Sequence, residues 1–424
     1  MGRPVPNRAG VPFGGMAVDE LQDEAQDLLT DAVGLRRDLH RRPEVGNDLP
    51  ITRERILEEL DDLGLDVTLH ESTSGIAALL TGGKPGPTIL LRADMDALPM
   101  PEQTGLDFAS EVDGAMHACG HDTHVAMLSG AARLLVARRQ DLTGRILFMF
   151  QPGEEGHHGA RYMLDEGLLD VPPLADGTPS PVEAAAAIHI TSALPSGWVS
   201  IRPGPIMASS DTLRIRIEGA GGHASEPHHT LDPVPIACEI VQAIQTMVTR
   251  RVDVFDPTVV TVASIHAGTT SNVIPDTCDI LGTIRSVSEA TRQRVHDGLR
   301  RVAEGIAAAH EVGVVVQIDN GYPVTVNDRD FASFATGVAK EVVGEDRTIV
   351  LPNPVMGAED FSYVLQRVPG SMMFLGATPT GQDPRRAPAN HSTKVYFEED
   401  AMAQGIALYS ALALRHLGAS TTGR

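Results

Sequence analysis

Four short apolar runs alternate with amphipathic segments along the chain, and this alternation constrains the fold more than any other feature. Runs of this length and composition are typical of strands buried on both faces of a sheet. Strands that alternate with helices predict an α/β domain with a mixed, mainly parallel sheet and helices on both faces. The runs are TILLRAD (88–94), RILFMF (145–150), AAAAIHI (184–190) and SMMFLG (371–376).

Helical periodicity separates these runs. Apolar residues recur at helical spacing from Met16 to Leu39, which predicts a helix there. A second helix is predicted over Arg53–Leu63 and ends at Gly64, a residue type that favours the position just after a helix. A third helix is predicted to begin near Asp122.

The middle of the chain has a different pattern. LRIRIEG (213–219) alternates apolar and polar residues as a half-exposed strand does, and VVVQID (314–319) does so less strictly. Two amphipathic segments lie between them, at 235–248 and 292–309. We therefore predict an inserted α+β domain, an open-faced sheet with two helices, at about residues 205–320. The flanking α/β domain would comprise 18–204 and 321–424.

Composition excludes several classes of protein. The chain has 34 Lys and Arg against 56 Asp and Glu, a formal net charge of −22, which disfavours binding to nucleic acid or anionic membranes. No apolar stretch approaches the roughly 20 residues of a membrane helix. Three scattered cysteines and no visible secretory signal predict a cytoplasmic protein. Residues 1–17 are interpreted as a disordered leader, or as sequence upstream of the true start.

Residues that bind metals gather where predicted strands end or helices begin. Asp94 and Asp96 follow the first strand, HACGHDTH (117–124) precedes a helix, and QPGEEGHH (151–158) follows the second strand. His189 lies at the end of the third strand, and His391 follows the fourth. The carboxyl ends of strands in an open α/β sheet form the ligand-binding crevice, so these segments are expected to meet.

Their side chains suit divalent metals. Zn²⁺ and similar ions take thiolate, imidazole and carboxylate ligands, and a tetrahedral ion needs only three or four. A surplus of ligands predicts two ions about 3.5–4 Å apart that share a bridging ligand and lower the pKa of a bound water. A remaining carboxylate can take the proton from that water. The six candidates are Cys119, His121, Glu154, Glu155, His189 and His391.

The adjacent acids Glu154 and Glu155 suggest a division of labour. In an extended backbone, neighbouring side chains point to opposite sides, so one acid can ligate metal while the other faces the water. The residues alone do not say which acid does which.

Seven motifs together resemble the amidohydrolases of the aminoacylase, hippurate hydrolase and auxin-conjugate hydrolase group, relatives of the two-metal carboxypeptidases. They follow the order of that group over about residues 34–410. The motifs are RADMDALP, MHACGHD, FQPGEEG, GAGGHASEPH, TSNVIPD, GTIR and MGAEDFSY.

The resemblance implies a role for each matching residue. Glu154 matches the general base, and Asp96 matches an acid that orients a neighbour beside the metals. In relatives, the histidine that matches His223 reaches the active site of the partner subunit and stabilises the oxyanion. Asn272 and Arg285 match residues that bind the substrate carboxylate. The residues that match metal ligands are Cys119, His121, Glu155, His189 and His391.

One departure from the group concerns the last ligand. Relatives often have Leu before this histidine and Pro two residues after it, whereas this chain reads NHSTKVYFEED from Asn390.

The resemblance implies a catalytic α/β domain, a lid and dimerisation domain formed by the insert, and a homodimer. It implies hydrolysis of the amide of an N-acyl amino acid or related conjugate, with two divalent ions per chain: Zn, Mn, Co or Ni. A dipeptidase or carboxypeptidase with the same two-metal site is an alternative. Further alternatives are a cysteine hydrolase that uses Cys119 and a histidine, and a non-catalytic protein that binds acylated amino acids.

Overall fold

The computed structural model describes residues 18–420, so the predicted leader lies outside the described residues. The chain divides into two compact units, and unit 2 comprises 205–325 and 353–362. Unit 1 contains the rest of the described chain. The expected insert, 205–320, falls within unit 2.

Residues 353–362 join unit 2 through backbone hydrogen bonds that sequence periodicity does not reveal. The Val355 N–H donates to the Ile206 carbonyl, and the Ala208 N–H donates to the carbonyls of Val355 and Gly357. Val355 lies more than 140 residues after Ala208 in the chain. Its segment nevertheless packs on the start of unit 2.

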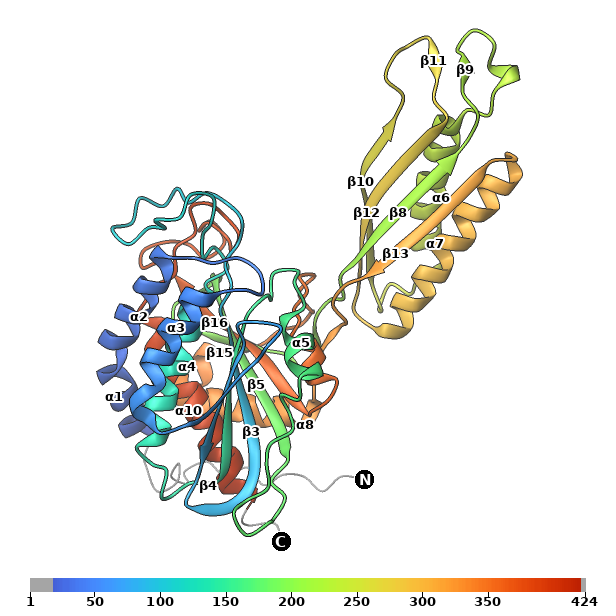
Figure 1. The fold of residues 1–424 in the computed structure, drawn as a ribbon. Helices are drawn as coiled ribbons and strands as arrows, with labels where there is room; N and C mark the ends of the chain where they lie inside the picture. The colour runs from blue at the N-terminus through green and yellow to red at the C-terminus, as the bar shows by residue number, and fades with distance from the viewer. Residues whose placement is uncertain (1–17, 421–424) are drawn as a thin grey trace. The chain divides into compact units, whose positions relative to one another are not determined.

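Unit 1 is built on an eight-stranded mixed sheet with the order β1-β2-β4-β3-β5-β16-β6-β15 (Figure 1). Its four central strands pair in parallel and contain the four predicted apolar runs. They are β3 (Lys84–Asp94), β4 (Thr143–Gln151), β5 (Val182–Pro195) and β16 (Gly370–Thr378). The outer strands are β1 (Asp66–Leu69), β2 (Ile76–Thr81), β6 (Val199–Ile201) and β15 (Thr348–Val350).

Helices cover this sheet on both faces, as predicted. On β4, Ile146, Phe148 and Phe150 point into the main hydrophobic core, where they pack with residues of α1, α2, α4, α8 and α10. Figure 1 shows α1, α2 and α4 on one side of the sheet and α5 on the other. The helices are α1 (Val18–Asp27), α2 (Leu29–Arg41), α3 (Pro50–Leu60), α4 (His121–Val136), α5 (Gly159–Asp165), α8 (Arg329–Val343), α9 (Ser362–Leu365) and α10 (Ala401–Ser420).

The predicted helices occur with shifted ends. The first is divided at Leu28 into α1 and α2. The second is α3, which continues as the 3₁₀ turn η1 (Asp61–Leu63) and ends at Gly64 in the left-handed conformation, φ 58°. A further 3₁₀ turn is η3 (Glu345–Arg347). Periodicity locates a helix but does not resolve its terminal residues.

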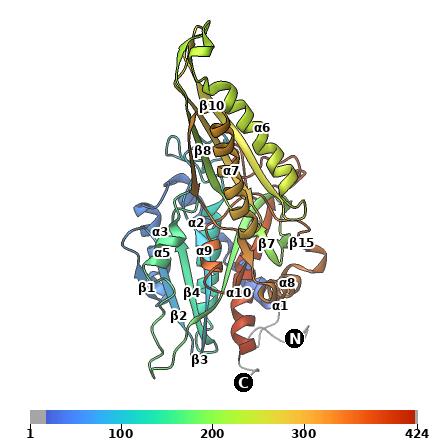
Figure 2. The same cartoon turned by 90° about the vertical axis from the view of Figure 1, so that its right-hand side faces the viewer.

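Unit 2 contains the predicted open-faced antiparallel sheet with two helices. The sheet order is β10-β12-β8-β13, and buried residues alternate with exposed ones along β8. Both helices contribute to a separate core beneath the sheet, and Figure 2 shows them side by side. The main elements are β8 (Asp211–Glu218), α6 (Pro233–Arg251), β10 (Thr258–Ala267), β12 (Thr277–Ser286), α7 (Glu289–Ala309) and β13 (Gly313–Asn320).

Short elements complete the chain. A small pair, β9 with β11, belongs to unit 2, and β7 and β14 occur where the chain passes between the units. They are β7 (Gly204–Met207), β9 (Gly222–His223), η2 (Pro227–His229), β11 (Val273–Ile274) and β14 (Thr325–Asn327). Within residues 18–420, no helix combines the length and the hydropathy that a membrane span requires.

Candidate metal centre

The carboxyl ends of the central strands of unit 1 bring the predicted ligands together. Asp94 ends β3 and pairs with Gln151 at the end of β4, so the segments that carry Asp96 and Glu154 leave the sheet side by side. His189 lies on β5, and α4 begins at His121. The alternation of strands and helices thus delivers each ligand-bearing segment to the same edge of the sheet.

Cys119 lies at the centre of the cluster. Its Sγ is 3.4 Å from Nε2 of His189 and 3.3 Å from Nε2 of His391. Nε2 of His391 is also 3.1 Å from Oε1 of Glu155. Cys119 belongs to two groups of three potential ligands whose atoms lie within 4.8 Å of one another, one with His121 and His189 and one with Glu155 and His391. A thiolate shared by two groups is suited to two ions.

The electrostatics of the cluster favour the ligating form of the thiol. Burial raises the pKa of Cys119, but the nearby His189 and His121 together more than offset this effect and lower the pKa to about 6. Hydrogen bonds to Cys119 and Glu155 raise the pKa of His391 to about 10. Anionic sulfur and carboxylate therefore attract positive charge at this point, as a cation site requires.

Each of the three imidazoles presents its Nε2 atom to the cluster. The Nδ1–H of His121 donates to the Asp96 carbonyl at 2.9 Å, and the Nδ1–H of His189 donates to the Ile190 carbonyl at 2.7 Å. The Nε2 of His121 is buried and makes no hydrogen bond within the described residues. Its lone pair suits a metal ion, so the donor set fits the two divalent ions that the sequence predicts.

Glu154 and Glu155 do not have the extended backbone that the sequence argument assumed. They lie in a turn after β4, in which the Gly156 N–H donates to the Glu154 carbonyl at 2.8 Å. The Asp96 carboxylate accepts both the Glu154 N–H, at 2.9 Å, and the Glu155 N–H, at 3.0 Å. One buried acid thus orients two consecutive peptide groups. The turn, rather than an extended backbone, directs the side chains of Glu154 and Glu155 to different places.

His124 ends the segment HACGHDTH and is not among the residues that the sequence predicts for the site. Its Nε2 accepts the Ile190 N–H at 2.7 Å, so the ring proton is on Nδ1, which donates to Asp94. Burial lowers the pKa of His124, in agreement with a neutral ring. Both nitrogens are occupied, so His124 supports the ligands without being one. Its position one helical turn after His121 on α4 is the sequence signal that could have identified it.

Asp94 is also part of this support. Its carboxylate accepts a hydrogen bond from Nη1 of Arg92 at 2.7 Å as well as the one from His124. Burial raises the pKa of Asp94, but the Arg92 charge and the nearby imidazoles hold it well below the ordinary value.

The three predicted residues of the insert fall into two places within unit 2. His223 pairs with Val273 across β9 and β11, next to Asn272, whose carbonyl accepts the Ala224 N–H at 3.1 Å. Asn272 precedes β12, which starts at Thr277, whereas Arg285 lies near the end of that strand. About 27 Å of strand separates Thr277 from Arg285. One copy of unit 2 therefore cannot place Asn272 and Arg285 on the same carboxylate.

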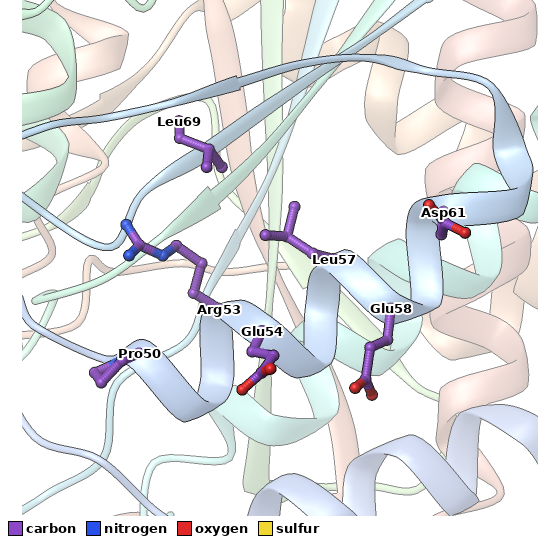
Figure 3. Close-up of a pocket in the computed structure, with 7 residues that line it drawn as sticks. All are labelled: Pro50, Arg53, Glu54, Leu57, Glu58, Asp61 and Leu69. Atoms are coloured by element: carbon purple, nitrogen blue, oxygen red, sulfur yellow. The ribbon is translucent and has the colours of Figure 1, made fainter.

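An open cavity of about 660 Å³ between α3 and β1 lies apart from the predicted ligands. Figure 3 shows Arg53 and Leu57 directed toward the strand that carries Leu69, whereas Glu54 and Glu58 point away. The lining contains no Cys or His, and none of the predicted site residues. This cavity therefore offers no ligand set like the one at the carboxyl ends of the central strands.

Comparisons with known proteins agree with this geometry. Residues 90–415 match the family described as peptidase family M20/M25/M40. The chain is 37% identical over 402 residues to thermostable carboxypeptidase 1 of Saccharolobus solfataricus, covering 94% of this chain and 98% of the relative. It is also 37% identical over 352 residues to N-acetylcysteine deacetylase of Bacillus subtilis, covering 83% of this chain and 89% of the relative.

A solved structure has the same fold. The Bacillus subtilis YxeP protein, described as a dinuclear metal-binding peptidase of the M20 family, superposes with a TM-score of 0.78 at 33% identity. The match covers 92% of this chain and 99% of that protein. By sequence and by fold, the chain therefore belongs to peptidase family M20/M25/M40 and is a metal-dependent amidohydrolase.

Proposed function

We propose that the protein hydrolyses the amide bond of N-acyl amino acids or related small conjugates and releases a carboxylic acid and an amino acid. The observation that carries the proposal is the convergence of His189, His391 and Glu155 on the sulfur of Cys119. Glu154 lies beside this cluster. The 37% identity to an N-acetylcysteine deacetylase supports an N-acyl amino acid substrate.

The ligands proposed for two divalent ions are Cys119, His121, Glu155, His189 and His391. Bound there, the ions would polarise the scissile carbonyl and lower the pKa of the attacking water. Zn, Mn, Co and Ni all suit this mixed donor set. Cys119 is a ligand in this proposal rather than a nucleophile, because a cysteine hydrolase would leave the gathered carboxylates without a role.

Glu154 is proposed as the general base. Its carboxylate is buried, and Oε2 lies 4.0 Å from Nε2 of His121. The turn held by Asp96 directs it to the cluster while Glu155 faces His391. Glu154 would accept a proton from the attacking water and deliver it to the departing amine.

Unit 2 is proposed to complete the site as a lid and dimerisation domain. His223 would donate to the oxyanion, and Asn272 and Arg285 would bind the substrate carboxylate. Asn272 lies before the start of β12 and Arg285 near its end, so both can serve one substrate only if they come from different subunits. The homodimer and the cytoplasmic location remain predictions from the sequence.

A carboxypeptidase or dipeptidase activity is the second candidate. The 37% identity to thermostable carboxypeptidase 1 over 94% of the chain favours it. Both activities cleave an amide next to an amino acid that carries a free carboxylate, so the same anchoring residues would serve either substrate.

The test uses Glu154→Gln and the wild-type protein, each reloaded separately with Zn²⁺, Mn²⁺, Co²⁺ or Ni²⁺. Free amine is measured from a panel of N-acyl amino acids and dipeptides, together with metal content. We expect chelation to abolish turnover, and Glu154→Gln to lower kcat by about 10²–10⁴-fold with two ions still bound. Full activity in Glu154→Gln would exclude the proposed base, and the ratio of acyl to peptide turnover separates the two candidates.

A further inference from the structure

The loop that carries His391 has an asparagine, Asn390, directly before the histidine. The loop also brings His391 to the cluster in an unusual backbone conformation, with φ 69°. A non-glycine residue in this left-handed region costs about 1 kcal/mol or more unless its surroundings stabilise it.

The amide of Asn390 is bonded to two of the segments that carry other ligands. Its Nδ2 donates to the carbonyl of Cys119 at 3.1 Å and to the carbonyl of Ile190, the residue after His189, at 3.1 Å. Its Oδ1 accepts the Ser192 N–H at 3.2 Å. Both protons and the oxygen are used, and this pattern also fixes which end of the amide is nitrogen.

These bonds join three ligand-bearing segments that are distant in sequence. The Ile190 carbonyl also accepts the Nδ1–H of His189, so the same oxygen orients His189 and holds Asn390. The neighbouring His391 N–H donates to the Ala118 carbonyl at 2.9 Å, just before Cys119. Asn390 and the His391 backbone together fix His391 against both segments.

We propose that Asn390 is a positioning residue of the metal centre, which holds Cys119, His189 and His391 in register through its side-chain amide. The inference rests on the proposed metal-binding role of these three residues. Leu has nearly the shape of Asn and no hydrogen-bonding group, so Asn390→Leu would keep the space filled and remove these bonds. The carbonyls of Cys119 and Ile190 would then each lose a donor.

The rest of the loop has anchors that do not involve Asn390. The Ser192 hydroxyl donates to the Pro388 carbonyl at 2.8 Å, and the Gln103 N–H donates to the Thr393 carbonyl at 2.7 Å. A substitution at Asn390 is therefore expected to leave the loop folded and to loosen the geometry of the ligands. This difference separates a positioning role from a purely structural one.

The experiment compares wild type, Asn390→Leu, His391→Ala and the matched control Lys394→Ala, an exposed change in the same loop. Co²⁺ is titrated into each metal-free protein, and the thiolate-to-cobalt charge-transfer band reports the bond to Cys119. The thermal midpoint of each metal-free protein and the kcat of each loaded protein are measured alongside.

We expect Asn390→Leu to weaken Co²⁺ binding by about 10–100-fold and to alter the band, while the metal-free midpoint stays close to that of Lys394→Ala. Wild-type affinity and an unchanged band in Asn390→Leu, with clear loss in His391→Ala, would overturn this inference alone. A lowered metal-free midpoint with unchanged Co²⁺ affinity would also overturn it. No Co²⁺ binding by the wild type, or no effect of His391→Ala, would instead overturn the proposed metal centre.

Discussion

Asp96 accepts the N–H groups of Glu154 and Glu155 with its two carboxylate oxygens, at 2.9 and 3.0 Å. The carbonyl of the same residue accepts the Nδ1–H of His121. A single side chain and its own backbone thus orient the proposed base and two proposed ligands. At the residue scale, the centre depends as much on these supporting bonds as on the ligands themselves.

Asp96→Asn tests this support. An amide offers only one oxygen, and its NH₂ group would face a backbone N–H, so one of the two glutamates loses its anchor. We expect kcat to fall by about 10–100-fold with two metal ions retained, measured by steady-state kinetics and metal analysis. Asp113→Asn, an exposed change, serves as the control. Wild-type kcat in Asp96→Asn would show that the anchoring of the turn is unimportant.

At the scale of elements, the start of α4 depends on one glycine. Gly120 lies between Cys119 and His121 with φ 88°, and the helix begins at the next residue. A Cβ at Gly120 would lie 2.4 Å from Cγ2 of Ile190 and 2.9 Å from Cε2 of Phe397. The close spacing of the two ligands is therefore compatible with this helix start only when glycine separates them.

Gly120→Ala is predicted to destabilise the protein by about 2–4 kcal/mol, from left-handed strain together with overpacking, and to weaken metal binding. The matched control is Gly114→Ala, where φ is 76° and nothing lies within 4 Å of the added Cβ. This control should lose about 1 kcal/mol from strain alone. Urea denaturation and metal titration measure both effects, and equal losses in the two variants would contradict the proposed clash.

At the scale of the whole molecule, the two units have separate hydrophobic cores. Unit 2 adds a buried ionic cluster to its core. Asp211, at the start of β8, accepts hydrogen bonds from Nε of Arg292 at 2.9 Å, from Nε2 of His296 at 2.8 Å and from the Gly321 N–H at 3.1 Å. The acid thus joins α7 to the start of β8 and to the residue that follows β13.

Asp211→Ala is predicted to destabilise unit 2 by about 3–5 kcal/mol, because it removes the buried partner of Arg292 and leaves that charge only the exposed Glu289. Hydrogen exchange should accelerate in β8, α7 and β13, while the amides of β3, β4 and β5 keep their protection. Asp319→Ala removes an exposed pair with Arg214 and should change stability by less than about 1 kcal/mol. Uniform acceleration through both units would show that they unfold together.

The sequence by itself determined the classes of element and the residue types of the site. Local periodicity predicted the four central strands and the open-faced sheet with two helices, because alternation and helical spacing are properties of short segments. Clusters such as HACGHDTH and GEE indicated metal chemistry because the residue types of a short segment can be read directly from the sequence. AAAAIHI was the weakest of the predicted strands, since alanine favours helix by intrinsic propensity and only its place between β3 and β16 makes it a strand.

Only the tertiary structure decided how these parts combine. The turn at Glu154, the neutral ring of His124 and the separation of Asn272 from Arg285 all follow from pairings that periodicity does not contain. The amide of Asn390 meets carbonyls 271 and 200 residues away in the chain. Hydrogen bonds across such separations depend on the packing of whole elements, so no local pattern in the sequence can specify them.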